Sequence, residues 1–272
     1  GAITAGQSVS LKSGGTLTVG NVTAGDEQDG DFSIALLGTG TVSAGNLTGT
    51  DSIGLLSRNG AITAQTVGTG GSLLALANGA VNLGGVTTAS SGTVYIANAS
   101  MVGLGGPIGE DFNPAPIFAA APVAVGGAIT LGGPLSSGTL TAAATGDFTA
   151  GNLTLGQRLT IGRAATAQVN GSWTAPTISI ASQRLLFGTE GTNIGIGGSQ
   201  TTNLMLRALA SQQTAVLGGT TRGEGYTLTQ ADFGRIRTSN LTIQVDQQGV
   251  SSSARDLEIR DLTLNGSGMS GG

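Results

Sequence analysis

Apolar residues alternate with Thr, Ser and Asn through the first hundred residues, and this alternation restarts about every twenty residues. Similar stretches begin at Thr16, Thr41, Ala61, Ala80 and Met101, which are spaced by 25, 20, 19 and 21 residues. Their second positions are Leu17, Val42, Ile62, Val81 and Val102. Apolar positions two apart are the period of a half-buried strand, whereas a helix needs spacings of three and four. We therefore predict that each repeat opens with a short strand.

A second strand lines up in each repeat. The runs "SIAL", "SIGL", "SLLA" and "TVYI" begin at Ser33, Ser52, Ser72 and Thr93. Their inward columns are Ile34, Ile53, Leu73 and Val94, followed by Leu36, Leu55, Ala75 and Ile96. One turn of two or three short strands cannot bury its own apolar face, so we expect equivalent strands of successive turns to stack.

The pattern restarts in the second half, where "AITLGGPLSSGTLTA" (128–142) copies "AVNLGGVTTASSGTVYI" (80–96). We expect Phe148 to continue the first-strand column 19 residues on, and Trp173 to continue it after a further 25. We expect Leu159 and Ile161, and then Leu185 and Phe187, to fill the second-strand columns. The extra residues of the longer turns are predicted to be corner insertions at 25–30 and 163–171.

Small residues that can turn lie between the strands. The pairs are Gly20-Asn21, Gly45-Asn46, Gly84-Gly85 and Gly151-Asn152. Gly and Asn tolerate positive φ, so we predict sharp corners at these pairs. The sequons that start at Asn21, Asn46, Asn152 and Asn240 follow from an Asn corner before a Thr-rich strand, and stacked Asn side chains can form a hydrogen-bonded ladder.

Together these patterns predict an all-β fold, a right-handed parallel β-helix (β-solenoid) with turns of about 19–25 residues and equivalent strands about 4.8 Å apart. We expect one continuous domain. Its predicted parts are regular turns over 1–104, a Pro-rich inserted loop over 105–126, continued solenoid over 127–264 and a flexible tail over 265–272. The sequence Thr229-x-x-Asp232 is a capping-box pattern. It predicts a short helix or turn near 229–236 that packs Tyr226, Leu228, Phe233 and Ile236.

The composition excludes several classes of function. The chain has 272 residues with no Cys and no His, which excludes thiol chemistry, Cys/His zinc sites and imidazole-dependent triads. Only 10% of residues are charged, aromatic residues make up 3%, and the net charge is −4 without a basic patch, so we expect no nucleic-acid partner. No apolar run approaches the roughly 20 residues of a membrane span. The chain begins at Gly1 without a signal-peptide pattern, and we expect a mature or interior part of a longer polypeptide.

One acidic loop is a candidate metal site. The segment "DEQDGD" holds Asp26, Glu27, Asp29 and Asp31. Carboxylates at alternate positions can wrap a hard cation such as Ca²⁺. The alternative is a solvated acidic loop, because charge runs usually face water. No other cofactor is expected.

The Pro-rich loop is a candidate partner-binding segment. Residues 105–126 hold four of the six prolines, and Pro cannot donate a hydrogen bond to a ladder. We therefore expect the segment to leave the solenoid and expose Phe112, Ile117 and Phe118 in part, as an apolar patch for a partner. The alternative is a loop that folds back and covers one face of the solenoid.

No motif predicts catalysis. Arg255, Asp256, Glu258, Arg260 and Asp261 alternate with apolar residues, which indicates ion pairs on the outward side of a strand. Polysaccharide lyases on β-helices use acidic clusters with a base, but no three carboxylates lie in register here. We therefore expect a protein that is not an enzyme.

The repeats "GTLTVGNVTAG" and "GDFTAGNLTLG", and the segment "NLMLRALASQQTAVLGGTTRGEGYTLTQADFGRI", resemble the passenger repeats of filamentous-haemagglutinin-like exoproteins. These are large surface proteins that Gram-negative bacteria export by two-partner secretion. The resemblance covers nearly the whole chain. It implies an extracellular or cell-surface β-helical stalk or filament that mediates adhesion or biofilm formation.

We accordingly expect a structural and adhesive role. The expected partners are the chain's own neighbouring turns or identical subunits stacked end to end, since a β-helix exposes strand edges at its ends. A host or abiotic surface or a glycan is a further candidate partner. A self-assembling filament subunit and a carbohydrate-active enzyme on the same fold are the alternatives.

Overall fold

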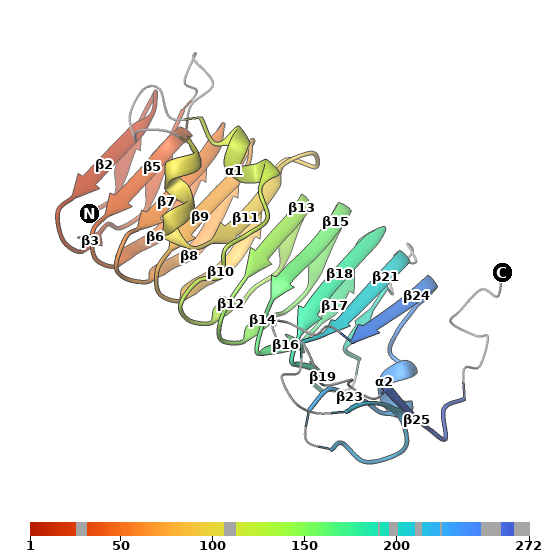
Figure 1. The fold of residues 1–272 in the computed structure, drawn as a ribbon. Helices are drawn as coiled ribbons and strands as arrows, with labels where there is room; N and C mark the ends of the chain where they lie inside the picture. Colours follow the sequence, from red (N-terminus) through yellow and green to blue (C-terminus); the bar gives the residue numbers. More distant parts are fainter. Residues whose placement is uncertain are drawn as a thin grey trace.

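The computed structural model describes residues 1–25, 32–105, 113–189, 191–195, 201–209, 214–223, 225–245 and 257–263. The chain coils into an elongated solenoid whose successive turns pair through parallel strands (Figure 1). The all-β class and the parallel solenoid are therefore confirmed. Each turn contributes strands to three ladders, which we call faces A, B and C.

The strands divide among the faces as follows. Face A holds β3 (Leu17–Thr18), the first parts of β6 (Val42–Gly49), β8 (Ile62–Thr69) and β10 (Val81–Thr87), and then β12 (Ile129–Leu131), β14 (Phe148–Ala150), β16 (Thr166–Val169) and β19 (Arg184–Phe187). Face B holds β1 (Ile3–Ala5), β4 (Val22–Ala24), the second parts of β6, β8 and β10, the first parts of β13 (Leu135–Ala143) and β15 (Leu153–Arg163), β17 (Ser172–Thr174) and β20 (Asn193–Ile194).

Face C is the ladder with the most strands. It holds β2 (Val9–Ser13), β5 (Phe32–Gly38), β7 (Ser52–Ser57), β9 (Leu73–Ala77), β11 (Thr93–Ala97), the second parts of β13 and β15, β18 (Thr177–Ser182), β21 (Thr201–Ala208) and β24 (Thr238–Val245). The remaining elements are η1 (Ala99–Gly105), α1 (Ala115–Ala119), β22 (Ala215–Gly218), β23 (Thr227–Leu228), α2 (Gln230–Phe233) and β25 (Leu257–Arg260).

The core is a stack of inward aliphatic side chains, as the repeats predict. On face C, Ile34 lies opposite Ile53, Ile53 opposite Leu73, and Leu73 opposite Val94. All four side chains are fully buried. The restart at Ala128 is also confirmed, because Ile129 pairs with Val81 on one side and with Phe148 on the other. The interior is thus filled rung by rung, with each rung one strand spacing from the next.

The predicted turn at Met101 is wrong. Val81 pairs with Ile129 and not with Val102, and residues 99–105 form the 3₁₀ helix η1 instead of a strand. The chain leaves the solenoid after β11 and returns at the bridge between Val125 and Ala144. The chain therefore leaves the solenoid several residues before the predicted loop. The cause is that the outward side of face C is apolar at β9 and β11.

The predicted 25-residue turn before Trp173 is also wrong. Residues 166–169 are strand β16, which places Ala167 opposite Phe148, while Trp173 lies opposite Leu153 on face B. β19 pairs with β16, so Leu185 and Phe187 continue face A and not the second-strand columns. Small inward residues such as Ala167 hid this strand, since an Ala among Thr and Gln gives little apolar contrast.

Three of the four corner glycines, Gly20, Gly45 and Gly84, are needed for space and not for a positive φ, whereas a Cβ on Gly151 would meet its nearest atom at 3.6 Å, an ordinary contact. Gly20, Gly45, Gly84 and Gly151 all keep negative or extended φ, which contradicts the predicted corner geometry. A Cβ on Gly45 would meet the carbonyl carbon of Gly20 at 2.9 Å and the nitrogen of Asn21 at 3.1 Å. The backbone of one turn thus passes so close to the next that a side chain cannot fit between them.

The corner asparagines form hydrogen bonds between turns, but at these corners their partners are backbone N–H groups and a Thr hydroxyl and not other Asn side chains. Asn21 Oδ1 accepts from the backbone N–H of Asn46 at 2.9 Å, and Asn46 Oδ1 accepts from the hydroxyl of Thr66 at 2.8 Å. Further along, Asn152 Oδ1 accepts from the backbone N–H of Ser172 at 2.9 Å. These side chains satisfy backbone donors where the strands turn.

The short helix near 229–236 is confirmed as α2. Thr229 and Asp232 form its capping box, in which each side chain accepts from the backbone N–H of the other residue. The four predicted packing residues are buried, from 0% exposed for Tyr226 and Leu228 to 6% for Phe233. The predicted flexible tail, 265–272, lies outside the described residues.

We expect Gly45→Ala to destabilise the solenoid by about 1–3 kcal/mol, because the added Cβ meets backbone that cannot move aside cheaply. The fluorescence of Trp173, the only tryptophan, reports unfolding in denaturant from inside the core. Gly68→Ala is the matched control, since its Cβ would have only the carbonyl oxygen of Leu47 within 4 Å, at 3.9 Å. Equal stability of the two variants would contradict the spatial explanation.

Candidate functional site

The acidic loop cannot be placed. Asp26, Glu27, Asp29 and Asp31 all lie outside the described residues, so the Ca²⁺ site stays a prediction. Across the part of the chain that the structure describes, no three His, Cys, Asp or Glu side chains gather closely enough to hold a metal ion.

The described part of the Pro-rich segment, residues 113–126, folds back on the solenoid. Phe112 lies outside the described residues, but Ile117 of α1 is fully buried and Phe118 is half-buried. Ile117 packs in a second hydrophobic cluster whose core members also include Leu56, Leu74, Leu76, Tyr95, Ala97, Ala99 and Met101. The expectation that Ile117 is exposed to a partner is therefore corrected: it covers face C. Figure 1 shows η1 and α1 lying over β7, β9 and β11.

The physical reason is that face C is apolar on its outward side in these turns. All five residues of β9, "LLALA", are buried, and four of the five in β11 are buried as well. A strand buried on both faces loses the alternation of a half-buried strand and becomes a continuous apolar run. That signal was present in the sequence at 73–77, and it would have predicted a cover over this face.

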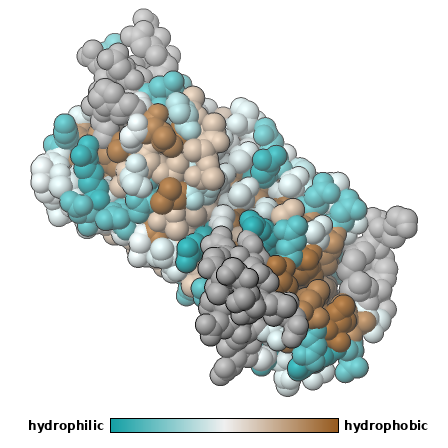
Figure 2. Space-filling view, in the orientation of Figure 1, coloured by the Kyte–Doolittle hydropathy of each residue, from teal (hydrophilic) through white to brown (hydrophobic). Residues whose placement is uncertain are grey.

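Tyr95 fixes the cover to the rod. Its hydroxyl donates to the carbonyl of Ala120 at 3.0 Å, and its ring meets the ring of Phe118 edge to face at 6.0 Å. Asn98 N–H donates to the carbonyl of Val123 at 2.8 Å where the chain returns. Burial raises the pKa of Tyr95 to about 12. The outer side of the cover keeps Leu104 and Val123 about half exposed, and Figure 2 shows hydrophobic surface on this half of the rod.

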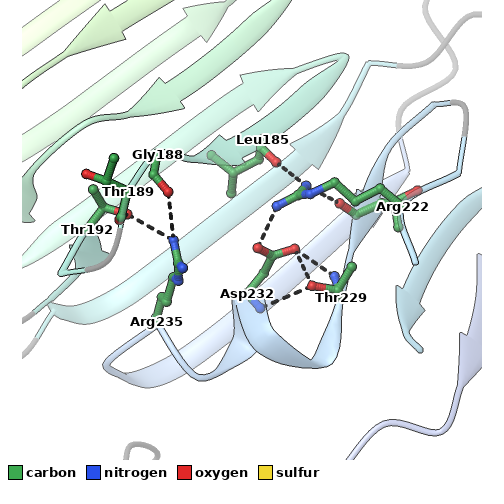
Figure 3. A network of polar contacts seen from close by, with 9 residues as sticks. Leu185, Gly188, Thr189, Thr192, Arg222, Thr229, Asp232 and Arg235 are labelled. Atoms are coloured by element: carbon green, nitrogen blue, oxygen red, sulfur yellow. Dashed lines mark hydrogen bonds and ion pairs between the residues drawn. The ribbon is translucent and has the colours of Figure 1, made fainter. Parts of the chain in front are cut away.

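A second cluster lies at the opposite end, where the C-terminal segment meets β19 (Figure 3). Arg222 Nη2 contacts Asp232 Oδ1 at 2.6 Å, and Arg222 Nη1 donates to the carbonyls of Leu185 and Thr227 at 3.2 and 3.3 Å. The other carboxylate oxygen of Asp232 accepts from the N–H and the hydroxyl of Thr229, each at 2.8 Å. Asp232 is 4% exposed, so its charge is buried but fully paired.

Arg235 makes a parallel anchor. Its Nη1 donates to the carbonyl of Gly188 at 3.2 Å and to the hydroxyl of Thr192 at 3.1 Å. Its guanidinium also lies over the ring of Phe187, 5.9 Å from the centroid. Two arginines therefore hold residues 222–223 and 225–236, which we call the cap segment, against β19 and the loop after it.

Tyr226 lies beneath this network without a hydrogen-bond partner for its hydroxyl. Burial, and secondly the negative charge of Asp232, raise its pKa well above the usual range. The phenol therefore stays neutral in the folded protein at any physiological pH.

A hollow of about 340 Å³ opens beside the network. We call it the β19 hollow; it is lined by Arg184, Leu185 and Leu186 of β19 and by Arg222, Gly223, Gly225 and Thr227. These residues offer guanidinium and hydroxyl donors over apolar side chains. Such a lining can bind and orient a small polar molecule. No sequence motif marks the hollow, because its residues come from segments about forty positions apart.

The charged pair at the end of the chain behaves as the sequence predicts. Arg260 donates to both carboxylate oxygens of Glu258 at 2.5 and 2.7 Å, on the exposed strand β25. The hydrogen bond from Arg260 lowers the pKa of Glu258; desolvation opposes it with a smaller effect, and the charge of Arg260 adds a still smaller lowering. Arg255 and Asp256 lie outside the described residues.

Among the described residues, no helix has the length and apolar character needed to span a membrane. Comparison of the chain with protein-family models, with curated proteins and with solved structures found no match.

We expect Asp232→Asn to loosen the cap segment by about 2–3 kcal/mol, because the variant loses a charge-assisted bond and leaves Arg222 partly buried without its counter-ion. Hydrogen exchange should become faster over 222–236 and stay unchanged in the central rungs. Glu258→Gln is the control, since an exposed ion pair contributes little. Unchanged exchange at 222–236 in Asp232→Asn would contradict the anchoring role.

The two tyrosines predict the alkaline limit of stability. The folded pKa of both is raised above the unfolded value of about 10. Their contribution is thus complete below about pH 10 and is lost as the pH rises through the folded pKa, which is about 12 for Tyr95 and higher for Tyr226. We expect phenolate absorbance to appear together with loss of β-structure. A phenolate transition near pH 10 in protein that stays folded would contradict the burial of these hydroxyls.

Proposed function

We propose that the chain is a section of a right-handed parallel β-helix that serves as a stiff structural and adhesive rod on a bacterial surface. The observation that carries this proposal is the unbroken ladder of face C, which runs from β2 to β24. Right-handedness is supported by the general rule that crossovers between parallel strands are right-handed in nearly all proteins. At about 4.8 Å per rung, ten rungs span on the order of 45 Å.

The surfaces that the rungs present support a scaffold role. Inward positions are aliphatic, and outward positions on face B are mostly small and uncharged. The outward column of face B runs Thr4, Thr23, Thr48, Gly68, Thr87, Ser136, Thr154 and Thr174. Such a surface provides a long, regular support, while the cover over face C and the cap segment provide its irregular features.

We also propose that the chain belongs to the filamentous-haemagglutinin-like exoproteins. The quoted repeats support it, since they become the corners and strands of the described turns. The absence of Cys suits a chain that is exported before it folds. The expected location is therefore extracellular, and the expected role is non-catalytic.

A self-assembling filament subunit is the second candidate. Inward side chains are only partly buried at both ends: Leu11 and Leu17 in the first turn, and Leu241 and Ile243 in β24. In the described part of the chain, β2 pairs only with β5 and β24 only with β21. Each end thus presents an unpaired strand edge beside incompletely covered core, which favours addition of a further rung.

Electron microscopy at several protein concentrations tests both candidates. We expect short rods at the lowest concentration, and lengthening rods at higher concentration if the ends assemble. Ile243→Lys should keep the rods short because it places a charge on the exposed end of the core, whereas Gln244→Lys, which changes the outward neighbour, should not. Compact round particles would contradict the rod itself, and equal lengths in both variants would contradict assembly through β24.

A further inference from the structure

The β19 hollow combines three features that the scaffold role does not use. Arg184 is exposed, and its guanidinium has no hydrogen bond or ion pair to any other described residue. Thr227 is 4% exposed, and its buried hydroxyl has no hydrogen-bond partner. Leu186 is half-buried at the same place. We propose that the β19 hollow binds a carboxylate-bearing sugar.

The side chain of Thr227 is directed away from the core. In β23, Leu228 is fully buried in the main hydrophobic cluster, and so is Tyr226 just before the strand. Successive side chains of a strand point to opposite sides, so Thr227 points to the other side, where the hollow lies. A buried hydroxyl without a partner normally costs about 1–3 kcal/mol, which makes it a group that needs an explanation.

Arg222 gives the hollow a fixed wall. Its contacts with Asp232, Leu185 and Thr227 use the guanidinium as a clamp, and its charge is balanced by Asp232. Arg184 is therefore the cation available to a ligand. A guanidinium matches a carboxylate with two parallel N–H donors, so an acidic ligand group fits at Arg184.

The remaining lining selects a sugar over a simple anion. The hollow lies within the size range of small-molecule sites, about 300–1,000 Å³. A sugar acid offers a carboxylate to Arg184, hydroxyls to Thr227 and a C–H face to Leu186. Inorganic phosphate would use Arg184 alone, and a neutral sugar would leave Arg184 unused. This inference goes beyond the rod function and does not depend on filament assembly.

Calorimetry on single rods tests the inference, with glucuronate as the probe and with glucose and inorganic phosphate as comparison ligands. We expect glucuronate to bind and the other two to bind at least tenfold more weakly. Arg184→Gln should weaken glucuronate at least tenfold, whereas Arg158→Gln, an exposed arginine on β15, should leave it unchanged.

The Thr227→Val variant tests whether the Thr227 hydroxyl contacts the ligand or whether the residue only packs in the fold. It keeps the shape of the side chain and removes the unpaired hydroxyl, so we expect higher thermal stability together with severalfold weaker glucuronate binding. Higher stability with unchanged binding would overturn the role of Thr227. No glucuronate binding, equal binding of phosphate, or equal losses in Arg184→Gln and Arg158→Gln would each overturn the site, while leaving the rod proposal intact.

Discussion

The backbone ladder between successive turns sets the constraint on which the rest of the structure depends. Equivalent strands must lie about 4.8 Å apart along the whole rod, so every corner has to pass the next at the same distance. At Gly45 and Gly171 this brings backbone to within about 3 Å of where a Cβ would lie. Glycine richness and a core of small aliphatics are thus consequences of one spacing, and they explain how a chain with 3% aromatic residues can still bury a continuous interior.

Polar groups inside the rod obey the same spacing. Ser57 is fully buried, and its hydroxyl donates to the carbonyl of Gly40 in the preceding turn at 2.9 Å. Ser137 donates to the carbonyl of Gly92 at 3.0 Å. The corner asparagines act similarly on backbone N–H groups. Because these hydroxyls and amides meet partners one turn away, they hold neighbouring turns in register. The buried hydroxyls of Ser182 and Thr201 are exceptions, since neither has a hydrogen-bond partner.

The inward columns could be predicted from sequence because a half-buried strand leaves a period of two. Ile34, Ile53, Leu73 and Val94 stack as the pattern indicates. The errors occurred where that contrast fails. Ala167 is too small to mark an inward position, and Val102 mimics one without being in a strand. The corners were located correctly but explained wrongly, since the approach of a neighbouring turn is a tertiary fact that no local propensity encodes.

The two irregular segments lie where repeated turns alone leave apolar surface or backbone carbonyls uncovered. Where the outward side of face C becomes apolar, at β9 and β11, the chain must leave the solenoid to cover it, and Tyr95 secures that cover.

Where the ladders of faces A and B end, the cap segment closes over β19, and it requires arginines because backbone carbonyls there no longer meet a next turn. The carbonyls of Leu185 and Gly188 are bonded by Arg222 and Arg235 in place of a strand. Side-chain cations thus replace the missing rung, and the hollow beside them arises because side chains fill the space less completely than a strand would. Specific recognition is therefore expected where the repeat stops, since identical turns present only identical surfaces.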